Sequence, residues 1–266
     1  MSFFSYGSHQ ICYESHGAGR PLILLHGNTA SGKMFDPIIP LLSEKYRVIN
    51  MDFLGCGRSD RMAVWPADLW YEWAKQACAL CEYLGLSEVI LVGTSGGALA
   101  AINAALEYPQ LVRFVAADSF AGICADPAVT YDIQAGRTQA KQIQGVRDYL
   151  RSLHGEDWEQ VFDADTDAVA RHAREIGAYF HHPLSALQVP LLLTGSEEDE
   201  MFPSGHYRRL FRENCRETRR AETHIFPHGG HPAMVSNMEE FSALPDRMRT
   251  EQDMMTITRG GGCLNL

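Results

Sequence analysis

A glycine-flanked serine is the residue of this chain with the clearest chemical potential. It lies in the run Gly93-Thr94-Ser95-Gly96-Gly97, between an apolar stretch that predicts a strand and an alanine-rich stretch that predicts a helix. A serine on such a turn adopts a strained backbone, which pushes its hydroxyl out of the sheet at a helix N-terminus, where free N–H groups favour negative charge. We therefore predict that Ser95 is a nucleophile. A glycine-rich turn that binds phosphate is the alternative for this pattern alone.

The rest of the chain predicts an α/β fold with a mostly parallel, doubly wound sheet. Short apolar runs alternate with longer helical patterns, and continuous apolar strands between helices are typical of a parallel sheet covered on both faces. We expect strands over residues 21–26, 46–52, 88–93, 111–118, 189–194 and 223–226, and helices over 70–84, 98–108 and 236–249.

One region interrupts this alternation. Residues 120–187 contain no clear strand and instead show helical patterns at roughly 130–153, 157–162 and 168–180. A helical insertion placed over the strand ends is typical of a lid. We therefore predict a core of residues 1–119 and 188–250, a helical lid of residues 120–187 inserted before the strand at 189–194, and a C-terminal tail of residues 251–266.

From about Ile11 to Phe241, outside the insertion, the sequence resembles the α/β-hydrolase fold family in its serine-nucleophile branch. Motifs around the serine carry the resemblance, and their order along the chain is that of the family. Besides the serine motif they are His26-Gly27-Asn28, Asp52-Phe-Leu-Gly55-Cys-Gly57-Arg-Ser59, Thr194-Gly195 followed by Asp199 and Pro203, and His228-Gly-Gly-His231-Pro232 followed by Glu239-Glu-Phe241.

The resemblance implies a catalytic triad of Ser95, Asp199 and His231. His231 would take the proton of the serine and return it to the leaving group, while the carboxylate would orient the imidazole. Glu198 is the alternative acid, because it lies at the family's usual spacing from the preceding glycine, although the spacing to the following proline fits Asp199 better. His228 is the alternative base.

The resemblance also implies substrate-binding groups at Asn28 and Gly96, whose backbone N–H groups would hold an oxyanion. Gly96 stands where the family often has a bulkier residue, so we expect a wider pocket beside the nucleophile. We also expect the side-chain amide of Asn28 at this pocket. His26 is interpreted as a brace of the oxyanion loop, and Asp52 as part of a scaffold loop whose glycines adopt positive φ.

The composition narrows the class of function. The 266 residues fit one large domain, and a net charge of −10 opposes binding to nucleic acid or anionic membranes, so we expect neither partner. Seven irregularly spaced cysteines, among them Cys78 and Cys81, favour reduced thiols. The sequence shows no signal peptide and no transmembrane stretch, and we expect a cytoplasmic protein. His181 and His182 lack a spaced carboxylate motif, so no metal is expected.

These observations predict a serine hydrolase that cleaves a small carboxylic ester through an acyl-enzyme intermediate, with a small-molecule substrate and no cofactor. Other reactions of the same triad stay open, because a fold does not determine its chemistry. They are hydrolysis of a carbon–carbon bond, a thioester or a lactone, and cofactor-free perhydrolysis. A non-catalytic ligand-binding protein is the alternative from another class.

Overall fold

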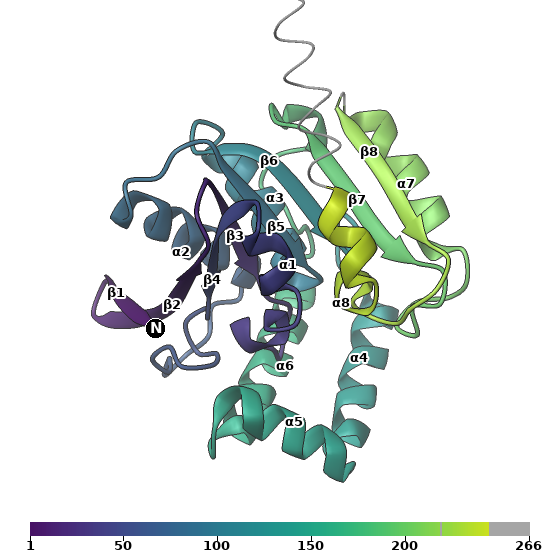
Figure 1. The fold of residues 1–266 in the computed structure, drawn as a ribbon. Helices are drawn as coiled ribbons and strands as arrows, with labels where there is room; N and C mark the ends of the chain where they lie inside the picture. Colours follow the sequence, from purple (N-terminus) through teal and green to yellow (C-terminus); the bar gives the residue numbers. More distant parts are fainter. Residues whose placement is uncertain (219, 245–266) are drawn as a thin grey trace, which may run out of the picture.

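The computed structural model describes residues 1–218 and 220–244, and a twisted central sheet runs through it (Figure 1). The sheet has eight strands in the order β1-β2-β4-β3-β5-β6-β7-β8. Strand β2 pairs antiparallel with β1 and β4, and every other pairing is parallel. The strands are β1 Ser2–Tyr6, β2 His9–His16, β3 Arg20–Leu25, β4 Tyr46–Met51, β5 Val89–Thr94, β6 Val112–Asp118, β7 Leu191–Ser196 and β8 Ala221–Phe226.

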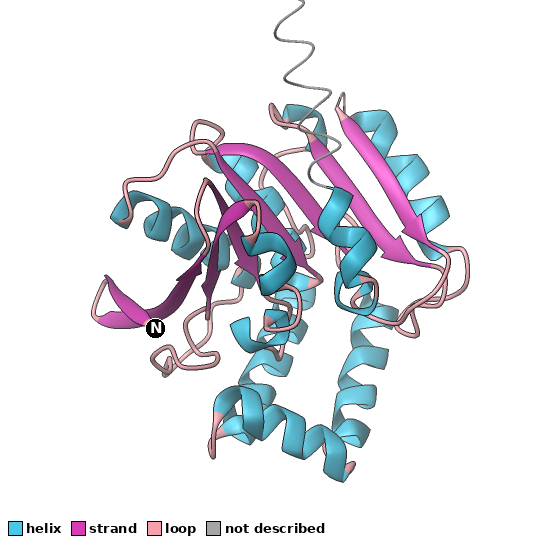
Figure 2. Ribbon diagram, in the orientation of Figure 1, coloured by secondary structure: helices cyan, strands magenta, loops and turns pink. Residues whose placement is uncertain are grey.

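Helices cover both faces of this sheet, as Figure 2 shows in cyan and magenta. Those outside the insertion are α1 Ile39–Ser43, α2 Leu69–Tyr83, α3 Gly96–Glu107, α7 His206–Glu217 and α8 Ala233–Ser236. A further helical stretch covers residues 238–244, where a helix over 236–249 is predicted, and the remainder of that prediction lies outside the described residues. The predicted mostly parallel, doubly wound α/β fold is confirmed.

Strand β3 illustrates why the sheet needs helices on both faces. Ile23 and Leu25 belong to the core that α2 and α3 cover, whereas Leu22 and Leu24 belong to the core under α1 and α8. All four side chains are fully buried. A strand buried on both faces has no polar positions, and this continuous apolar pattern is what the sequence shows.

The N-terminal hairpin of β1 and β2 is absent from the sequence-based expectations. Its two strands are joined by a turn in which Gly7 has φ +59°. Strand β1 buries only Phe4, and β2 ends in the exposed residues Ser15 and His16. So few buried positions give too weak a periodic signal to identify a strand.

The insertion between β6 and β7 consists of α4 Pro127–Ala140, α5 Gln144–His154 and α6 Trp158–Glu175, which stand together at one end of the sheet (Figure 1). The single helix expected over 130–153 is wrong, because the chain turns at 141–143, where no glycine or proline marks a break. The helices expected over 157–162 and 168–180 are one helix, which ends before Gly177 at φ +78°. The lid role and the domain bounds stay predictions, and the predicted tail lies outside the described residues.

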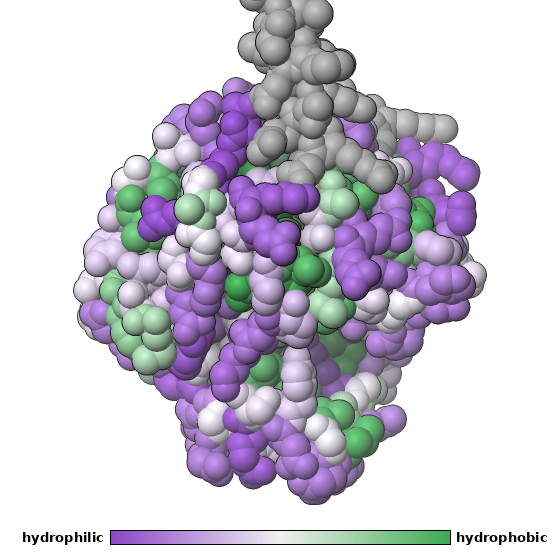
Figure 3. Space-filling model, in the orientation of Figure 1, coloured by the Kyte–Doolittle hydropathy of each residue, from purple (hydrophilic) through white to green (hydrophobic). Residues whose placement is uncertain are grey.

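The face shown in Figure 3 is mostly hydrophilic, with hydrophobic residues in small separate groups.

Cys78 and Cys81 are buried in α2, and burial raises the pKa of Cys81 to about 12, which keeps this thiol protonated at neutral pH.

Among the residues described, none of the helices combines the length and the apolar character needed to cross a bilayer.

Candidate active site

Ser95 lies on the turn between β5 and α3, as the sequence predicts. Its backbone has φ +55° and ψ −119°, a conformation that residues with a side chain rarely adopt. A Cβ at Gly97 would overlap the carbonyl oxygen of Leu25, so a glycine is needed for α3 to pass this close to β3. The small residues of the motif therefore build a tight turn on which the serine is half-buried rather than enclosed.

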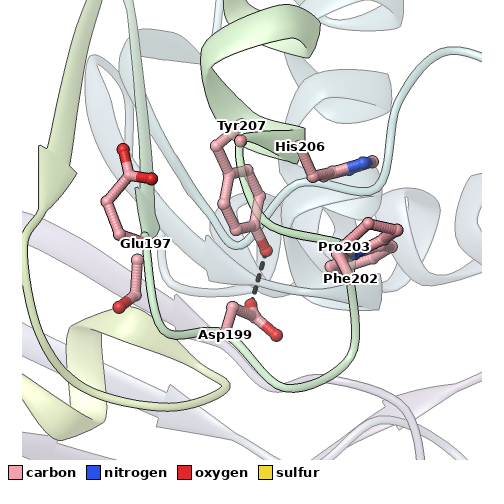
Figure 4. Close-up of a pocket in the computed structure, with 8 residues that line it drawn as sticks. Glu197, Asp199, Phe202, Pro203, His206 and Tyr207 are labelled. Carbon is pink, nitrogen blue, oxygen red and sulfur yellow. Dashed lines mark hydrogen bonds between the residues drawn. The ribbon is translucent and has the colours of Figure 1, made fainter.

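Asp199 and His231 form a buried pair (Figure 4 shows the acid). Nδ1 of His231 lies 2.9 Å from Oδ2 of Asp199, and the two side chains are 13% and 1% exposed. The Tyr207 hydroxyl donates to the same oxygen at 2.6 Å, and the Met201 N–H donates to Oδ1 at 2.9 Å. Because a carboxylate only accepts, Nδ1 of His231 carries the proton and Nε2 keeps its lone pair for a substrate or nucleophile.

Glu198, the alternative acid, faces the alternative base instead. Its carboxylate accepts from the Gly229 N–H at 3.2 Å and lies 3.4 Å from Nδ1 of His228. The Glu198 and His228 side chains are 61% and 80% exposed. The second acid–base pair therefore lies in water, where it lacks the fixed geometry of the buried pair.

Asp118, at the end of β6, connects the Ser95 turn with the loop that carries His231. This fully buried carboxylate accepts from the Thr94 hydroxyl at 2.9 Å, the Thr194 hydroxyl at 2.7 Å and the Met234 N–H at 3.1 Å. Thr94 precedes Ser95, and Met234 follows the loop of His231. Burial raises the pKa of Asp118 against the opposing effect of these hydrogen bonds. Asp118 is not among the site residues expected from the sequence, although a charged side chain that ends an apolar strand is a recognisable signal.

Ser95 and His231 are not hydrogen-bonded to each other in this structure. The Ser95 hydroxyl forms no hydrogen bond with any residue in the described ranges, and Nε2 of His231 has none there either. Catalytic hydrogen bonds are often long without substrate and tighten in the Michaelis complex. The structure thus brings Asp199 and His231 together directly, and joins their loops to the Ser95 turn through Asp118.

The predicted oxyanion donors lie beside the serine. A Cβ built on Gly27 would lie 3.1 Å from the Cβ and 3.7 Å from the Oγ of Ser95, so this loop passes close to the serine hydroxyl. Within the described part of the chain, the N–H groups of Asn28 and Gly96 donate to no acceptor. Two unpaired amide hydrogens beside a nucleophile can stabilise the charge that develops on a carbonyl oxygen.

The expectation that Gly96 widens the pocket is wrong. A Cβ at this position would overlap Oδ1 of Asn28 and lie 2.6 Å from Nε1 of Trp70, so other side chains already fill the space. The Asn28 amide is also tied at both ends, since Oδ1 accepts from Trp70 Nε1 at 3.0 Å and Nδ2 donates to Asp165 at 2.9 Å. Glycine is present at position 96 because the asparagine and the indole need the room.

His26 and Asp52 have the supporting roles expected of them. His26 is fully buried, lies 2.8 Å from the Gly27 carbonyl oxygen through Nδ1, and accepts from the Phe53 N–H at 3.1 Å through Nε2. Asp52 accepts from the Gly32 N–H at 2.7 Å and from the backbone and side chain of a following arginine. Both residues therefore shape loops beside the site.

His181 and His182 share Glu107 as a neighbour, since Nδ1 of His181 lies 3.7 Å from Oε1 of that residue. Nε2 of His181 contacts Asp68 at 2.6 Å, and Nε2 of His182 lies 3.5 Å from Glu107. The described residues contain no group of three or more histidine, cysteine or acidic side chains that could hold a metal ion.

Comparisons with known proteins agree with this architecture. The chain is 24% identical over 274 residues to the 2-hydroxy-6-oxo-6-(2'-aminophenyl)hexa-2,4-dienoic acid hydrolase of Metapseudomonas resinovorans, covering 90% of this chain and 87% of that protein. It is 27% identical over 247 residues to the serine hydrolase BPHL of Homo sapiens, covering 89% and 82%. An esterase from Exiguobacterium antarcticum has the same fold, with a TM-score of 0.73 at 19% identity, covering 93% and 99%.

A sequence model of the alpha/beta hydrolase family matches residues 22–244. That match spans most of β3, the strands β4 to β8, the insertion and every loop of the candidate site. This chain therefore belongs to the α/β hydrolase family.

Proposed function

We propose that this protein is a serine hydrolase of small carboxylic esters, in which Ser95, His231 and Asp199 act as a triad. The buried contact between Nδ1 of His231 and Oδ2 of Asp199 is the observation that supports this most. It fixes the tautomer that a general base for serine requires. The strained Ser95 turn supplies the nucleophile next to two unpaired amide hydrogens.

In the proposed reaction, a bond forms between Ser95 Oγ and the ester carbonyl carbon while the hydroxyl proton moves to Nε2 of His231. The carbonyl π electrons become an oxyanion, which the N–H groups of Asn28 and Gly96 hold; each such donor contributes about 3 kcal/mol. The tetrahedral species collapses to an acyl-enzyme, and His231 returns the proton to the departing alcohol. Water then repeats these steps and releases the carboxylic acid.

A second candidate is hydrolysis of a carbon–carbon bond next to a ketone by the same residues. The relative from Metapseudomonas resinovorans is named as the hydrolase of a 6-oxo dienoic acid, and it matches 90% of this chain. The same oxyanion donors suit a ketone carbonyl, so the site itself fits both reactions. Ester cleavage is preferred because it needs no further group to protonate a carbon leaving group.

A substrate panel tests the proposal. Wild type, Ser95→Ala and the exposed control Ser185→Ala are assayed with p-nitrophenyl esters, thioesters, lactones and a 2-hydroxy-6-oxo dienoic acid. We expect ester turnover in wild type and control, and a loss of about 10⁴-fold in Ser95→Ala. Turnover of the dienoic acid alone would replace the first candidate with the second. No turnover, together with no organophosphorus adduct on Ser95 by mass spectrometry, would leave a non-catalytic binding protein.

A further inference from the structure

A buried acid of the insertion holds the turn that carries the proposed oxyanion donor. Asp165 lies in α6, and its side chain is fully buried. Its Oδ2 accepts from the Thr29 N–H at 3.1 Å and from the Asn28 side-chain amide at 2.9 Å. Its Oδ1 accepts from Arg137 of α4 at 2.8 Å, which neutralises the buried charge. One carboxylate therefore joins two helices of the insertion to the loop next to Ser95.

The same turn is held from a second helix of the insertion. Thr29 has φ +58°, a left-handed conformation that is unusual for a residue with a branched side chain. Its carbonyl oxygen lies 3.0 Å from Nε2 of His154 in α5, while Nδ1 of that histidine accepts from the Gly57 N–H at 2.9 Å. Contacts from the insertion thus fix both backbone polar groups of Thr29, and a strained turn persists where its surroundings over-determine it.

A residue of the core holds the other end of the Asn28 side chain. Trp70 of α2 donates to Oδ1 of Asn28 at 3.0 Å, opposite the contact between Nδ2 and Asp165. The contacts of Thr29 hold the two peptides on either side of that residue, and the contacts of the Asn28 side chain hold the α-carbon next to the Asn28 N–H. The Asn28 N–H therefore has little freedom to change direction. An oxyanion donor is effective only when it already points at the position where charge develops.

We propose that Asp165 is a positioning residue that orients the Asn28 N–H, so that the oxyanion site is complete only while the helical insertion is seated on the core. This inference rests on the proposed function. It goes beyond that function, because stabilisation of the transition state would then depend on the position of the helical insertion. Asp165 itself, buried behind the loop, need not touch the substrate.

The chain offers a matched control on the same helix. Asp163 lies two residues from Asp165 and also links α6 to the end of α4, through the C-cap residue Lys141 at 2.9 Å, but its side chain is 58% exposed and contacts no residue of the oxyanion loop. Asp163→Asn therefore removes an ion pair between the same two helices without changing the turn. Asp165→Asn keeps the shape of the side chain but places an amide where Oδ1 and Oδ2 accept three donors.

The experiment measures kcat, KM and inhibition by a small alkyl boronic acid, with active sites counted by complete reaction with an organophosphorus reagent. We expect Asp165→Asn to lower kcat per titrated site by about 10- to 100-fold with KM changed by less than about 3-fold. The boronic acid, which mimics the tetrahedral species, should bind more weakly by about the same factor as the loss in kcat/KM. Asp163→Asn should stay within about 2-fold of wild type for all three quantities.

A second variant and a second readout protect the test against misfolding. Asp165→Glu keeps the charge opposite Arg137 but displaces the carboxylate, and should also lower kcat by at least about 5-fold. Amide hydrogen exchange should show the Thr29 N–H exchanging at least about 10-fold faster in both Asp165 variants than in Asp163→Asn. The inference is overturned if the Asp165 variants turn over and exchange like Asp163→Asn. Failure of the proposed function would look different, since wild type would then show no Ser95-dependent turnover.

Discussion

The Tyr207 hydroxyl donates a hydrogen bond of 2.6 Å to Oδ2 of Asp199, the same oxygen that lies 2.9 Å from Nδ1 of His231. Burial opposes ionisation of Asp199, but hydrogen bonds from His231, Tyr207 and Met201, with the charge of His231, hold its pKa below the ordinary value. Burial, reinforced by the charge of Asp199, raises the pKa of Tyr207 far above the ordinary value. The acid therefore stays ionised while the phenol stays a donor.

We predict that Tyr207→Phe moves the acid limb of the pH–kcat/KM profile to higher pH by about half a unit and lowers the plateau about 3- to 10-fold. Without the hydrogen bond from Tyr207, the negative charge of Asp199 stabilises protonated His231 more strongly. The protonated, inactive pair therefore persists to higher pH. The exposed Tyr131→Phe serves as the control. A profile that keeps its midpoint in Tyr207→Phe would show that the phenol only fills space.

The two acids next to β7 give the second prediction. Asp199→Asn should lower kcat/KM by about 10²- to 10⁴-fold, because an amide can donate to Nδ1 and select the wrong tautomer of His231. Glu198→Gln should stay within about 2-fold, since Glu198 is 61% exposed and pairs with His228. Steady-state kinetics with one ester suffices, and a larger loss in Glu198→Gln would transfer the role of the acid to that residue.

The Ser95 turn and the strands of the parallel sheet were predictable because their sequence signals are local. Strand β5 begins with an apolar run, and glycines are required at 93 and 97 by contacts within a few residues or with the adjacent strand. A buried parallel strand and a tight turn each leave a pattern that a short window of sequence contains. The order of the motifs then indicated Asp199 and His231.

Tyr207 and Asp165, which support the site, leave no such pattern in the sequence. Tyr207 follows Asp199 by eight residues on a helix that the sequence analysis did not assign, and Asp165 reads as one more polar residue in an acidic run. Only the tertiary fold shows that Asp165 is buried against Arg137 and the oxyanion loop. Pairs so far apart in sequence arise from packing, and periodicity does not encode which polar residue faces inward.

Gly96 gives the third prediction, and it too depends on a contact that the sequence hides. Gly96→Ala should lower kcat/KM at least about 10-fold and destabilise the fold by about 1–3 kcal/mol, because its Cβ overlaps Oδ1 of Asn28. The added Asn28→Ala substitution removes that oxygen, so the double variant should regain part of the lost stability. Gly136→Ala, whose Cβ meets nothing within 4 Å, is the control. Additive losses in thermal unfolding would contradict this account.

His26 gives the fourth prediction, a pH dependence of stability. Burial lowers the pKa of His26 to about 4 from the ordinary 6.5, outweighing the opposing hydrogen bond to the Gly27 carbonyl. Its Nε2 accepts from the Phe53 N–H at 3.1 Å. Protonation would place an N–H on Nε2 that points at the Phe53 N–H, so the hydrogen bond would be lost. The unfolded chain protonates this imidazole below about pH 6.5, whereas the folded chain resists until about pH 4.

The free energy of unfolding should therefore fall as the pH drops through this window, by about 1.4 kcal/mol per pH unit from His26 alone. Burial also lowers the pKa values of His154 and His172, which adds to the decrease in the same direction. Urea unfolding between pH 7 and 4.5 measures the slope, and the ring of His26 can be titrated by NMR. His228→Gln, at a position with an 80% exposed side chain, should keep the wild-type slope, whereas His26→Gln should flatten it. A stability that stays level or rises on acidification would mean that His26 binds its proton in the folded protein as readily as in the unfolded one.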